Sequence, residues 1–377
     1  MIRWWIRIAN EADTLVSRRV VIGGLVAGSA AVAGGSFVRS AFNRNMNGWT
    51  QTSPPAQTHA QANGTMNYRT LGKSGIKVSE VSFGAWGIGG AAYGAADRAE
   101  SLNALARAEE LGCNFVDTAM VYGDSELVVG EFLKGRRDKW LIATKFSGQN
   151  AGLEATLDEQ LRRLGVDHVD LYMVHWVPSA SEHELYEALY RAKKAGKARL
   201  VGFSLYTIAE IRHVLSQTDA DALMVAFNLL SPDPYLAKLD AIRKSGIGVI
   251  VRSSLQEGFL TGKYKRDATF PDPNDQRHNW SAEKIAATVD AAERFRFVEQ
   301  DVGSMLVGAA CYPLCFDETS TVIMGTKSAK YADTNFGVVP SKRLSIEYLQ
   351  RVQMLQRRMN LYDRKGRLKD AIRGLFA

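Results

Sequence analysis

With 377 residues the chain is long enough for two domains or for one large α/β barrel with additional segments, and either arrangement has an ample core. Its net charge of +7 suggests a nucleic-acid partner, but residues 1–62 hold six arginines against two acidic residues, and the remaining 41 basic and 38 acidic residues nearly balance. That remainder has no basic stripe with interleaved aromatic residues, so nucleic-acid binding is not expected.

The N-terminal segment resembles a twin-arginine export signal. Ser17-Arg18-Arg19 precedes an uncharged run from Val20 to Ala33, whose glycines weaken a helix. This run of 14 residues has the length of a signal peptide and is shorter than the roughly 20 residues that span a bilayer. Ala31-Val32-Ala33 is a small-x-small cleavage motif, and Ala60-Gln61-Ala62 is the alternative. We therefore predict a signal peptide over residues 1–33.

Residues 34–66 are predicted to be a disordered linker, because the stretch 43–65 is polar, contains Pro54-Pro55 and has little periodicity. The folded part is expected over residues 67–377. Passage through the twin-arginine translocation machinery would place it in the periplasm or outside the cell. A leader that is not cleaved would instead tether it to the membrane.

Apolar strand-like runs alternate with helical patterns from Asn67 onward, which is the signature of βαβ units and a parallel sheet. Residues 68–79 have the pattern of a β-hairpin that closes the bottom of a barrel. Strands are expected near residues 81–83, 115–117, 141–143, 171–173, 200–202, 223–225, 249–251 and 321–323. Helices are expected over 99–111, 153–164, 184–195, 208–215 and, at the C-terminal end, 345–359.

Eight such units over about 270 residues are what a (β/α)8 TIM barrel requires. We therefore predict an α/β TIM barrel with an N-terminal β-hairpin and a C-terminal helix. An open doubly wound sheet is the alternative, but a dinucleotide-binding sheet needs G-x-G-x-x-G after its first strand. The glycines of residues 84–90 have the wrong spacing for that motif.

The three cysteines, Cys113, Cys311 and Cys315, do not form a metal motif, because a lone C-x3-C cannot supply four zinc ligands. No metal is expected, and the cysteines are interpreted as small buried apolar residues. In an oxidising compartment a disulfide between Cys311 and Cys315 is the alternative. Two cysteines four residues apart on a helix fit disulfide geometry poorly.

Three predicted strands end in Asp117, Lys145 and His175, and Tyr122 follows in the loop after the first of them. In a barrel such strand ends meet at one mouth. Reduction of a carbonyl needs a hydride at carbon and a proton at oxygen, but tyrosine alone titrates near pH 10. A neighbouring ammonium lowers that pKa, and a carboxylate keeps the ammonium charged. Tyr122 is thus the predicted proton donor, supported by Lys145 and Asp117, while His175 orients the carbonyl.

Taken singly, these residues also have structural explanations as an ion pair, a loop aromatic and a core histidine. Their order, however, resembles the aldo-keto reductases, which are barrel enzymes with a nicotinamide cofactor and an Asp/Tyr/Lys/His tetrad. The resemblance spans about residues 68–355 and is carried by residues 111–119, 122–126, 144–145, 164–167, 174–176, 196–199, 202–204, 258–264 and 325–335. It implies an NAD(P)-dependent oxidoreductase that acts on CH–OH or carbonyl groups.

The resemblance also implies a cofactor site on the loops after the later strands. Its predicted residues are Ser204, Asn228, Arg252, Ser253, Leu255, Gly258, Lys263, Thr326, Lys327, Ser328 and Asn335. NADP is expected, with NAD as the alternative, because Lys327 at a 2′-phosphate would favour NADP. The chain departs from the family pattern at Leu205, Met224 and Tyr331, and at Arg252, where many members stack an aromatic ring on the nicotinamide.

Trp86 and Trp176, together with Tyr122, are expected to wall a substrate pocket for a small carbonyl compound or alcohol, which residues 276–280 would close. The main hypothesis is an exported NADP-dependent oxidoreductase with Tyr122 as proton donor. A non-catalytic or redox-sensing nucleotide-binding barrel is the alternative, in which the departures mark lost turnover. A membrane-tethered scaffold anchored by the leader is a third.

Overall fold

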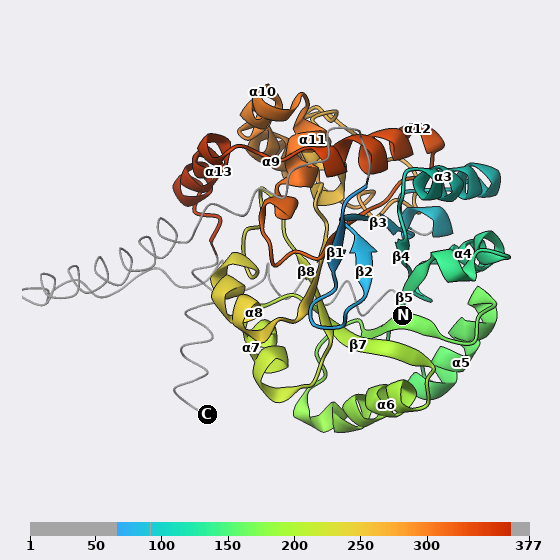
Figure 1. Cartoon of the computed structure of the whole chain (residues 1–377). Coiled ribbons are helices and arrows are strands. Elements are labelled where there is room, and N and C mark those ends of the chain that lie inside the picture. The colour runs from blue at the N-terminus through green and yellow to red at the C-terminus, as the bar shows by residue number, and fades with distance from the viewer. Residues whose placement is uncertain (1–65, 91, 363–377) are drawn as a thin grey trace, which may run out of the picture. The chain divides into compact units, whose positions relative to one another are not determined.

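The computed structural model describes residues 66–90 and 92–362, so the predicted signal peptide and nearly all of the predicted linker lie outside the described residues. Within this part, eight parallel strands form one closed barrel in the order β10-β3-β4-β5-β6-β7-β8-β9 (Figure 1). The strands are β3 (Val81–Gly84), β4 (Phe115–Asp117), β5 (Leu141–Phe146), β6 (Val169–Val174), β7 (Ala198–Leu205), β8 (Ala222–Ala226), β9 (Gly248–Arg252) and β10 (Thr321–Met324). Each coincides with a predicted strand, which confirms the barrel.

Helices follow the strands around the outside of the barrel. After β3 to β8 come α3 (Arg98–Glu110), α4 (Ser125–Leu133), α5 (Leu153–Leu164), α6 (His183–Lys194), α7 (Ile208–Gln217) and α8 (Leu239–Ser245). The connection from β9 to β10 contains α9 (Ala282–Glu293), α10 (Glu299–Val302) and α11 (Met305–Cys311), and α12 (Ala329–Ala332) and α13 (Ile346–Arg358) follow β10. The five predicted helices agree to within two residues at each end, whereas α4 and α8 to α12 were not predicted.

Local sequence signals set the helix ends. Thr207 caps α7 by accepting a hydrogen bond from the Glu210 amide, and the Glu210 carboxylate accepts one from the Thr207 amide in return. Glycine ends helices in the same way: α5 ends at Gly165, whose φ of 66° lies in the left-handed region. These ends fix where each helix begins its return to the next strand.

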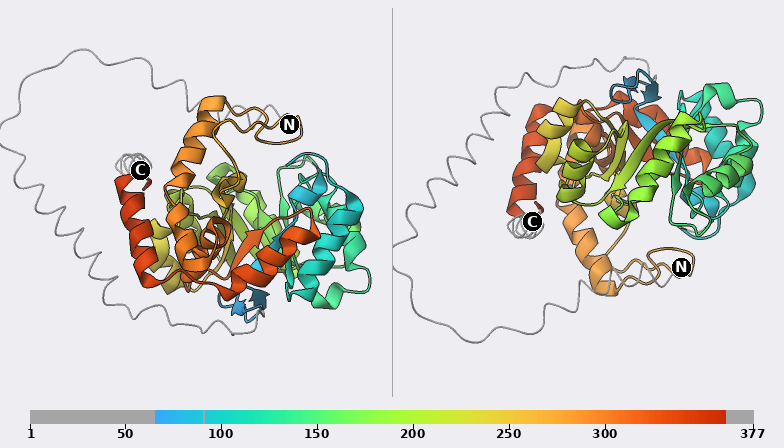
Figure 2. Two further views of the ribbon diagram at one scale, coloured as in Figure 1. Left: turned by 90° about the horizontal axis from the view of Figure 1, so that it is seen from above. Right: turned by 90° about the horizontal axis from the view of Figure 1, so that it is seen from below.

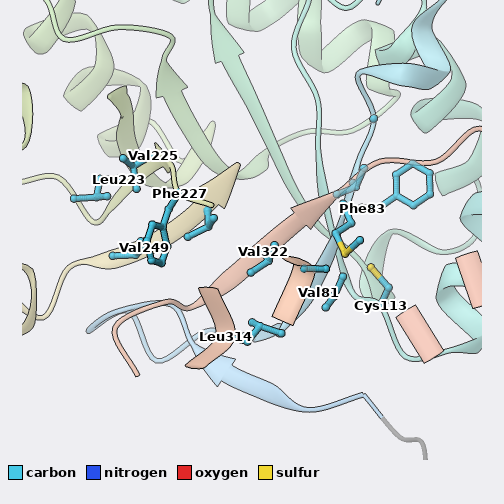
Figure 3. Close-up of a cluster of buried hydrophobic side chains, with 14 of the residues drawn as sticks. Val81, Phe83, Cys113, Leu223, Val225, Phe227, Val249, Leu314 and Val322 are labelled. Atoms are coloured by element: carbon cyan, nitrogen blue, oxygen red, sulfur yellow. The ribbon is translucent and has the colours of Figure 1, made fainter. Parts of the chain in front are cut away.

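Alternation along the strands produces two apolar layers. Val81, Phe83, Leu223, Val225 and Val249 belong to the cluster between the sheet and the helices, shown in Figure 3. The second cluster fills the barrel lumen and contains Phe115, Ala143, Leu171, Met173, Leu200, Ala222, Met224 and Ile250. Because the lumen is packed with side chains, polar chemistry is confined to its ends.

The hairpin of β1 (Tyr68–Thr70) and β2 (Lys77–Ser79) closes one end of the lumen. Its buried residues Leu71 and Val78 are members of the lumen cluster. Gly72 has a φ of 54°, and a Cβ there would lie 2.2 Å from the amide nitrogen of Gly248, so no other residue fits. The predicted hairpin at the barrel bottom is thus confirmed, and the opposite end is left for chemistry.

The C-terminal helix α13 lies on a flank of the barrel. In both views of Figure 2 it stands on the opposite side from α3 and α4. Its buried Gln356 donates from Nε2 to the carbonyl of Leu229, 3.0 Å away, in the loop after β8. No helix of the described residues is both long enough and apolar enough to cross a membrane.

The cysteines are free thiols. Cys113 and Cys311 are buried and Cys315 is partly buried. Burial raises the pKa of the Cys113 thiol to about 12 and that of Cys315 to about 11, so neither is poised for thiolate chemistry. Their interpretation as small apolar residues agrees with this environment.

Candidate active site

Strand alternation points the predicted polar residues into the open end of the lumen. Asp117, Lys145 and His175 each stand two positions beyond a lumen residue on β4, β5 and β6, so their side chains share its face. Ser204 stands four positions beyond the lumen residue Leu200 on β7, and Arg252 two positions beyond Ile250 on β9, so both share the lumen face. The mouth is therefore lined by polar groups from neighbouring strands, above an apolar floor.

Lys145 is the centre of the predicted tetrad. Its ammonium is fully buried and donates to Asp117 Oδ1 at 2.6 Å and to the carbonyl of Thr118 at 2.8 Å. The same nitrogen lies 3.4 Å from the hydroxyl of Tyr122. A buried charge is tolerated only when paired and hydrogen-bonded, and Lys145 satisfies both conditions.

Tyr122 lies in the loop between β4 and α4, and its hydroxyl lies 3.5 Å from Nε2 of His175. The other ring nitrogen of His175, Nδ1, is 2.9 Å from the hydroxyl of Ser147. Ser147 stands two residues beyond Lys145 at the end of β5, and the sequence analysis did not single it out. Lys145, Tyr122 and His175 thus surround one small volume at the mouth, as predicted.

The protonation states follow from burial. Burial raises the pKa of Asp117 and lowers the pKa of Lys145, and their mutual contact opposes both shifts. Burial, with Asp117 next, also raises the pKa of Tyr122 well above 10. The sequence predicts a lowered pKa for Tyr122, whereas in this site desolvation of the phenolate outweighs the favourable charge of Arg252 and the pKa is raised. Tyr122 keeps its proton at neutral pH, as a proton donor must.

A buried polar network behind the tetrad holds its parts in register. The Glu126 carboxylate, on α4, accepts from the Thr144 hydroxyl at 2.7 Å and from Gln160 Nε2 at 2.8 Å. Gln160 also donates to the carbonyl of Lys145 at 3.0 Å. Arg163 links Glu126 to the carbonyl of Gly123, next to Tyr122. These residues connect β5, α4 and the Tyr122 loop. The sequence did not indicate that they contact one another.

Aromatic rings extend from the tetrad along one side of the mouth. The ring centroids of Trp86 and Tyr122 are 5.9 Å apart, and those of Trp86 and Tyr93 are 5.4 Å apart. Trp176 instead contacts Phe146 at 5.9 Å and packs against the outer core. Trp86 therefore stands beside the tetrad as predicted, while the contacts of Trp176 lie on the neighbouring rim.

The predicted cofactor residues occupy the other half of the rim, on β7 to β10 and the turns that follow them. Two buried atoms there have no hydrogen-bond partner within the described residues, the Ser204 hydroxyl and Arg252 Nε. Buried polar groups normally have partners, so unpaired ones at a mouth fit a polar ligand such as a nicotinamide with its carboxamide. The residues present thus suit the cofactor that the sequence implies. Leu205, by contrast, belongs to the outer apolar layer.

Three predicted cofactor residues, Asn228, Thr326 and Ser328, make hydrogen bonds within the protein. The side chain of Asn228 is buried; its Nδ2 donates to the Ser253 carbonyl and to Gln256, and its Oδ1 accepts from the amides of Leu230 and Ser231. It shapes the turn after β8 and positions Ser253, whose φ is 56°. Thr326 and Ser328 likewise bond each other at the start of α12. Asn335 is buried in the turn after α12.

Lys327 binds the loop after β3. Its Nζ donates to the carbonyls of Tyr93 and Ala95 at 2.8 and 2.9 Å. Residues 272–276 of the β9–β10 connection contact the same loop. There the backbone N–H of Gln276 donates to the Ala92 carbonyl at 2.9 Å. Two loops are therefore bonded to each other and to Lys327 beyond the end of β10.

Arg277 anchors that connection. It is buried and binds Asp275 through two nitrogens at 2.9 and 2.6 Å. A third nitrogen donates to the Glu257 carbonyl at 2.8 Å, and the guanidinium lies 4.9 Å from the ring of Tyr93. Residues 276–280 were expected to close the pocket, and this ion pair fixes the start of that stretch.

In the part of the chain that the structure describes, no group of three or more His, Cys, Asp or Glu side chains is arranged to bind a metal ion.

Comparison with known proteins agrees with the site. The sequence profile of the Aldo/keto reductase family matches residues 80–357. The chain belongs to this family. Among its relatives, Aldo-keto reductase str7 of Strobilurus tenacellus is 31% identical over 323 residues, covering 80% of this chain and 95% of str7. Aldo-keto reductase yakc [NADP(+)] of Schizosaccharomyces pombe is 29% identical over 293 residues, covering 70% and 85% respectively.

A solved relative has the same fold. The glycerol dehydrogenase AKR11B4 from Gluconobacter oxydans superposes with a TM-score of 0.65 at 25% identity, covering 79% of this chain and 96% of that one. Family membership, together with the assembled tetrad, makes this aldo/keto reductase an NAD(P)-dependent oxidoreductase that acts on carbonyl groups.

The approach of Gly89 to Tyr122 provides a test of the site geometry. A Cβ at Gly89 would lie 1.5 Å from the Tyr122 carbonyl oxygen, so Gly89→Ala must displace the Tyr122 loop. We expect kcat/KM for an aldehyde to fall by about 100-fold, the usual cost of a shift of about 1 Å at a reacting group. Gly87→Ala is the control, because its Cβ would meet Lys327 at an ordinary 3.5 Å. Equal activity of the two variants, at equal melting temperature, would contradict this geometry.

The burial of His175 predicts a pH dependence of stability. Burial, then the charges of Lys145 and Arg252, hold the pKa of His175 well below its ordinary value. As pH falls below about 6.5 the unfolded chain takes up this proton and the folded protein does not. Stability present above that pH is therefore lost at lower pH, by up to ~1.4 kcal/mol per pH unit.

Urea unfolding between about pH 7 and 5 should show a shallower loss in His175→Gln than in the native protein. His183→Gln, at a side chain that is 73% exposed, is the control and should retain the native slope. A native slope in His175→Gln would mean that this histidine takes up its proton equally in the folded and unfolded chains.

Proposed function

We propose that this aldo/keto reductase transfers hydride between the nicotinamide of NADP and an aldehyde, ketone or alcohol, with Tyr122 as the proton donor. The observation that carries the proposal is the position of the Lys145 ammonium, bound to Asp117 and 3.4 Å from the Tyr122 hydroxyl. The nicotinamide supplies or accepts the hydride. The protein's own residues bind the substrate oxygen and move its proton.

During reduction, negative charge develops on the carbonyl oxygen, and the groups that face it must stabilise that charge. Tyr122 Oη and His175 Nε2 are 3.5 Å apart and can both donate to one oxygen. When the Ser147 hydroxyl donates to Nδ1, the neutral imidazole carries its proton on Nε2 and faces the substrate. Tyr122 then gives up its proton, and Lys145 stabilises the resulting phenolate.

NADP rather than NAD is proposed because two lysines, Lys263 and Lys327, stand on the cofactor half of the rim, and a relative is named for NADP(+). Lys327 now binds the carbonyls of Tyr93 and Ala95, so contact with a phosphate would have to replace or share those bonds. A charged phosphate is a stronger acceptor than a neutral carbonyl, which favours that exchange.

Export is the second part of the proposal. Ser17-Arg18-Arg19 and the apolar run after it resemble a signal for a pathway that carries folded proteins. An enzyme exported in this way would take up its nucleotide in the cytoplasm and keep it in the periplasm. It would then oxidise one substrate and reduce another on the same nucleotide. The bonds between residues 272–276 and the loop after β3 support slow release.

A redox-sensing barrel without turnover is the second candidate, motivated by Met224 and Arg252 where the family pattern differs. The assembled tetrad and its supporting network favour the enzyme, because a sensor has no need of a proton donor.

Removing one oxygen tests the proton donor. Tyr122→Phe should lower kcat for aldehyde reduction with NADPH by about 10²- to 10⁴-fold, the usual contribution of a positioned general acid. Tyr68→Phe, on the hairpin at the closed end of the barrel, is the matched control and should leave kcat unchanged. Unchanged activity of Tyr122→Phe on a panel of aldehydes would refute the proposed role.

Mass analysis of the exported protein tests cofactor and retention together. We expect about one equivalent of nucleotide, identified as NADP(H), to be released when protein purified from the periplasm of its native host is denatured. Protein that reaches the periplasm without nucleotide would contradict the proposal that the folded protein keeps its nucleotide bound during export. Release of NAD(H) would contradict the choice of NADP as cofactor. The mass of the mature N-terminus shows whether cleavage follows Ala33.

A further inference from the structure

Arg252 carries a positive charge at the mouth, and no carboxylate of the described residues forms an ion pair with it. Its guanidinium carbon lies 4.6 Å from the ring centroid of Tyr206, and Nη2 donates to the Leu205 carbonyl at 3.3 Å. Nε is buried without a partner, and within residues 66–90 and 92–362 no acidic side chain lies close enough to pair with it. Arginine presents five donors, so most of this group's capacity is unused.

Two other cations at the mouth are paired with carboxylates. Lys145 is paired with Asp117 at 2.6 Å, and Arg277 is paired with Asp275. Glu257 is the remaining acid nearby, but burial raises the pKa of its carboxyl, and its charge is shared among Arg252, Lys284 and Arg277. Arg252 therefore differs from Lys145 and Arg277 in having no carboxylate in contact with it.

The field of this guanidinium reaches the reacting groups. After burial and Lys145, Arg252 is the next cause that lowers the pKa of His175, and its charge also acts on Asp117, Tyr122 and Lys145. A substrate oxygen bound between Tyr122 and His175 lies in the same field. The atom that exchanges hydride with the substrate carbon must come within about 3.5 Å of it. The nicotinamide therefore also lies in that field.

The two redox forms of the nicotinamide differ in ring charge. The reduced dihydropyridine ring is neutral, and loss of a hydride leaves a pyridinium with one positive charge. All other charges of the nucleotide, including its phosphates, are the same in both forms. An uncompensated cation therefore disfavours the oxidised form specifically, while contacts with the phosphates cancel in a comparison of the two forms.

We propose that Arg252 is a redox-tuning residue, which makes this site bind the reduced nucleotide in preference to the oxidised one. The inference rests on the nicotinamide chemistry of the proposed function and goes beyond it by fixing which form is retained. It follows that the bound couple has a raised reduction potential, so that hydride accepted from an alcohol is held on the nucleotide. An exported molecule would then carry mainly the reduced form.

The test compares dissociation constants for NADP⁺ and NADPH in native protein, Arg252→Met and Arg252→Lys, measured by calorimetry at one ionic strength. For unit charges about 10 Å apart and an effective dielectric constant of about 20, Coulomb's law gives a preference on the order of tenfold. We expect the ratio of the NADP⁺ constant to the NADPH constant to fall about tenfold in Arg252→Met. This corresponds to ~1.4 kcal/mol and about 30 mV for a two-electron couple. Arg252→Lys, which keeps the charge, should retain the native ratio.

Arg162→Met is the matched control, since that side chain is 73% exposed and pairs with Glu159 on α5. It should leave both constants unchanged. Equal weakening of both forms in Arg252→Met would overturn the inference, because it would assign Arg252 a structural role. An unchanged ratio with a raised KM only for carboxylate-bearing aldehydes would also overturn it, in favour of a substrate anchor. Failure of every variant and of the native protein to bind either nucleotide would instead refute the proposed function itself.

Discussion

The chemistry of this protein depends on one buried ion pair. Lys145 and Asp117 come from adjacent strands, and neither could remain charged in the lumen without the other. Their contact places an ammonium next to the Tyr122 hydroxyl, where it opposes the cost of forming a phenolate in an apolar setting. The barrel supports this pair from below with packed side chains and from behind with the Glu126–Gln160 network. The fold therefore keeps the buried Lys145 ammonium charged and in position beside Tyr122.

Much of the barrel was predictable because each strand is a short apolar run between helices with clear ends. The tetrad was predictable because three of those runs end in a polar residue, and strand ends of a closed parallel barrel meet at one mouth. The conformation of the β9–β10 connection was not predictable, because it is held by contacts such as the Arg277–Asp275 pair and not indicated by any periodicity in the sequence. The raised pKa of Tyr122 was missed for a related reason, because desolvation is a property of the assembled site.

The departures from the family pattern fall on the half of the rim where we propose that the cofactor binds, and the tetrad half is intact. Arg252 and Met224 point into the lumen, whereas Leu205 is directed away from it into the outer core. The chain thus keeps the machinery that handles the substrate oxygen and differs where the nucleotide would lie. Such a division suits an enzyme whose reaction is common to its family and whose handling of the cofactor is its own.

The hairpin that closes the barrel also fixes where the described chain begins. The described chain enters at Met66, which is buried beside Gly112 at the closed end. Catalysis takes place at the far ends of the same strands, a full barrel height away. Any handle attached ahead of Met66, whether a translocation signal or a membrane anchor, is therefore joined to the face that has no chemistry.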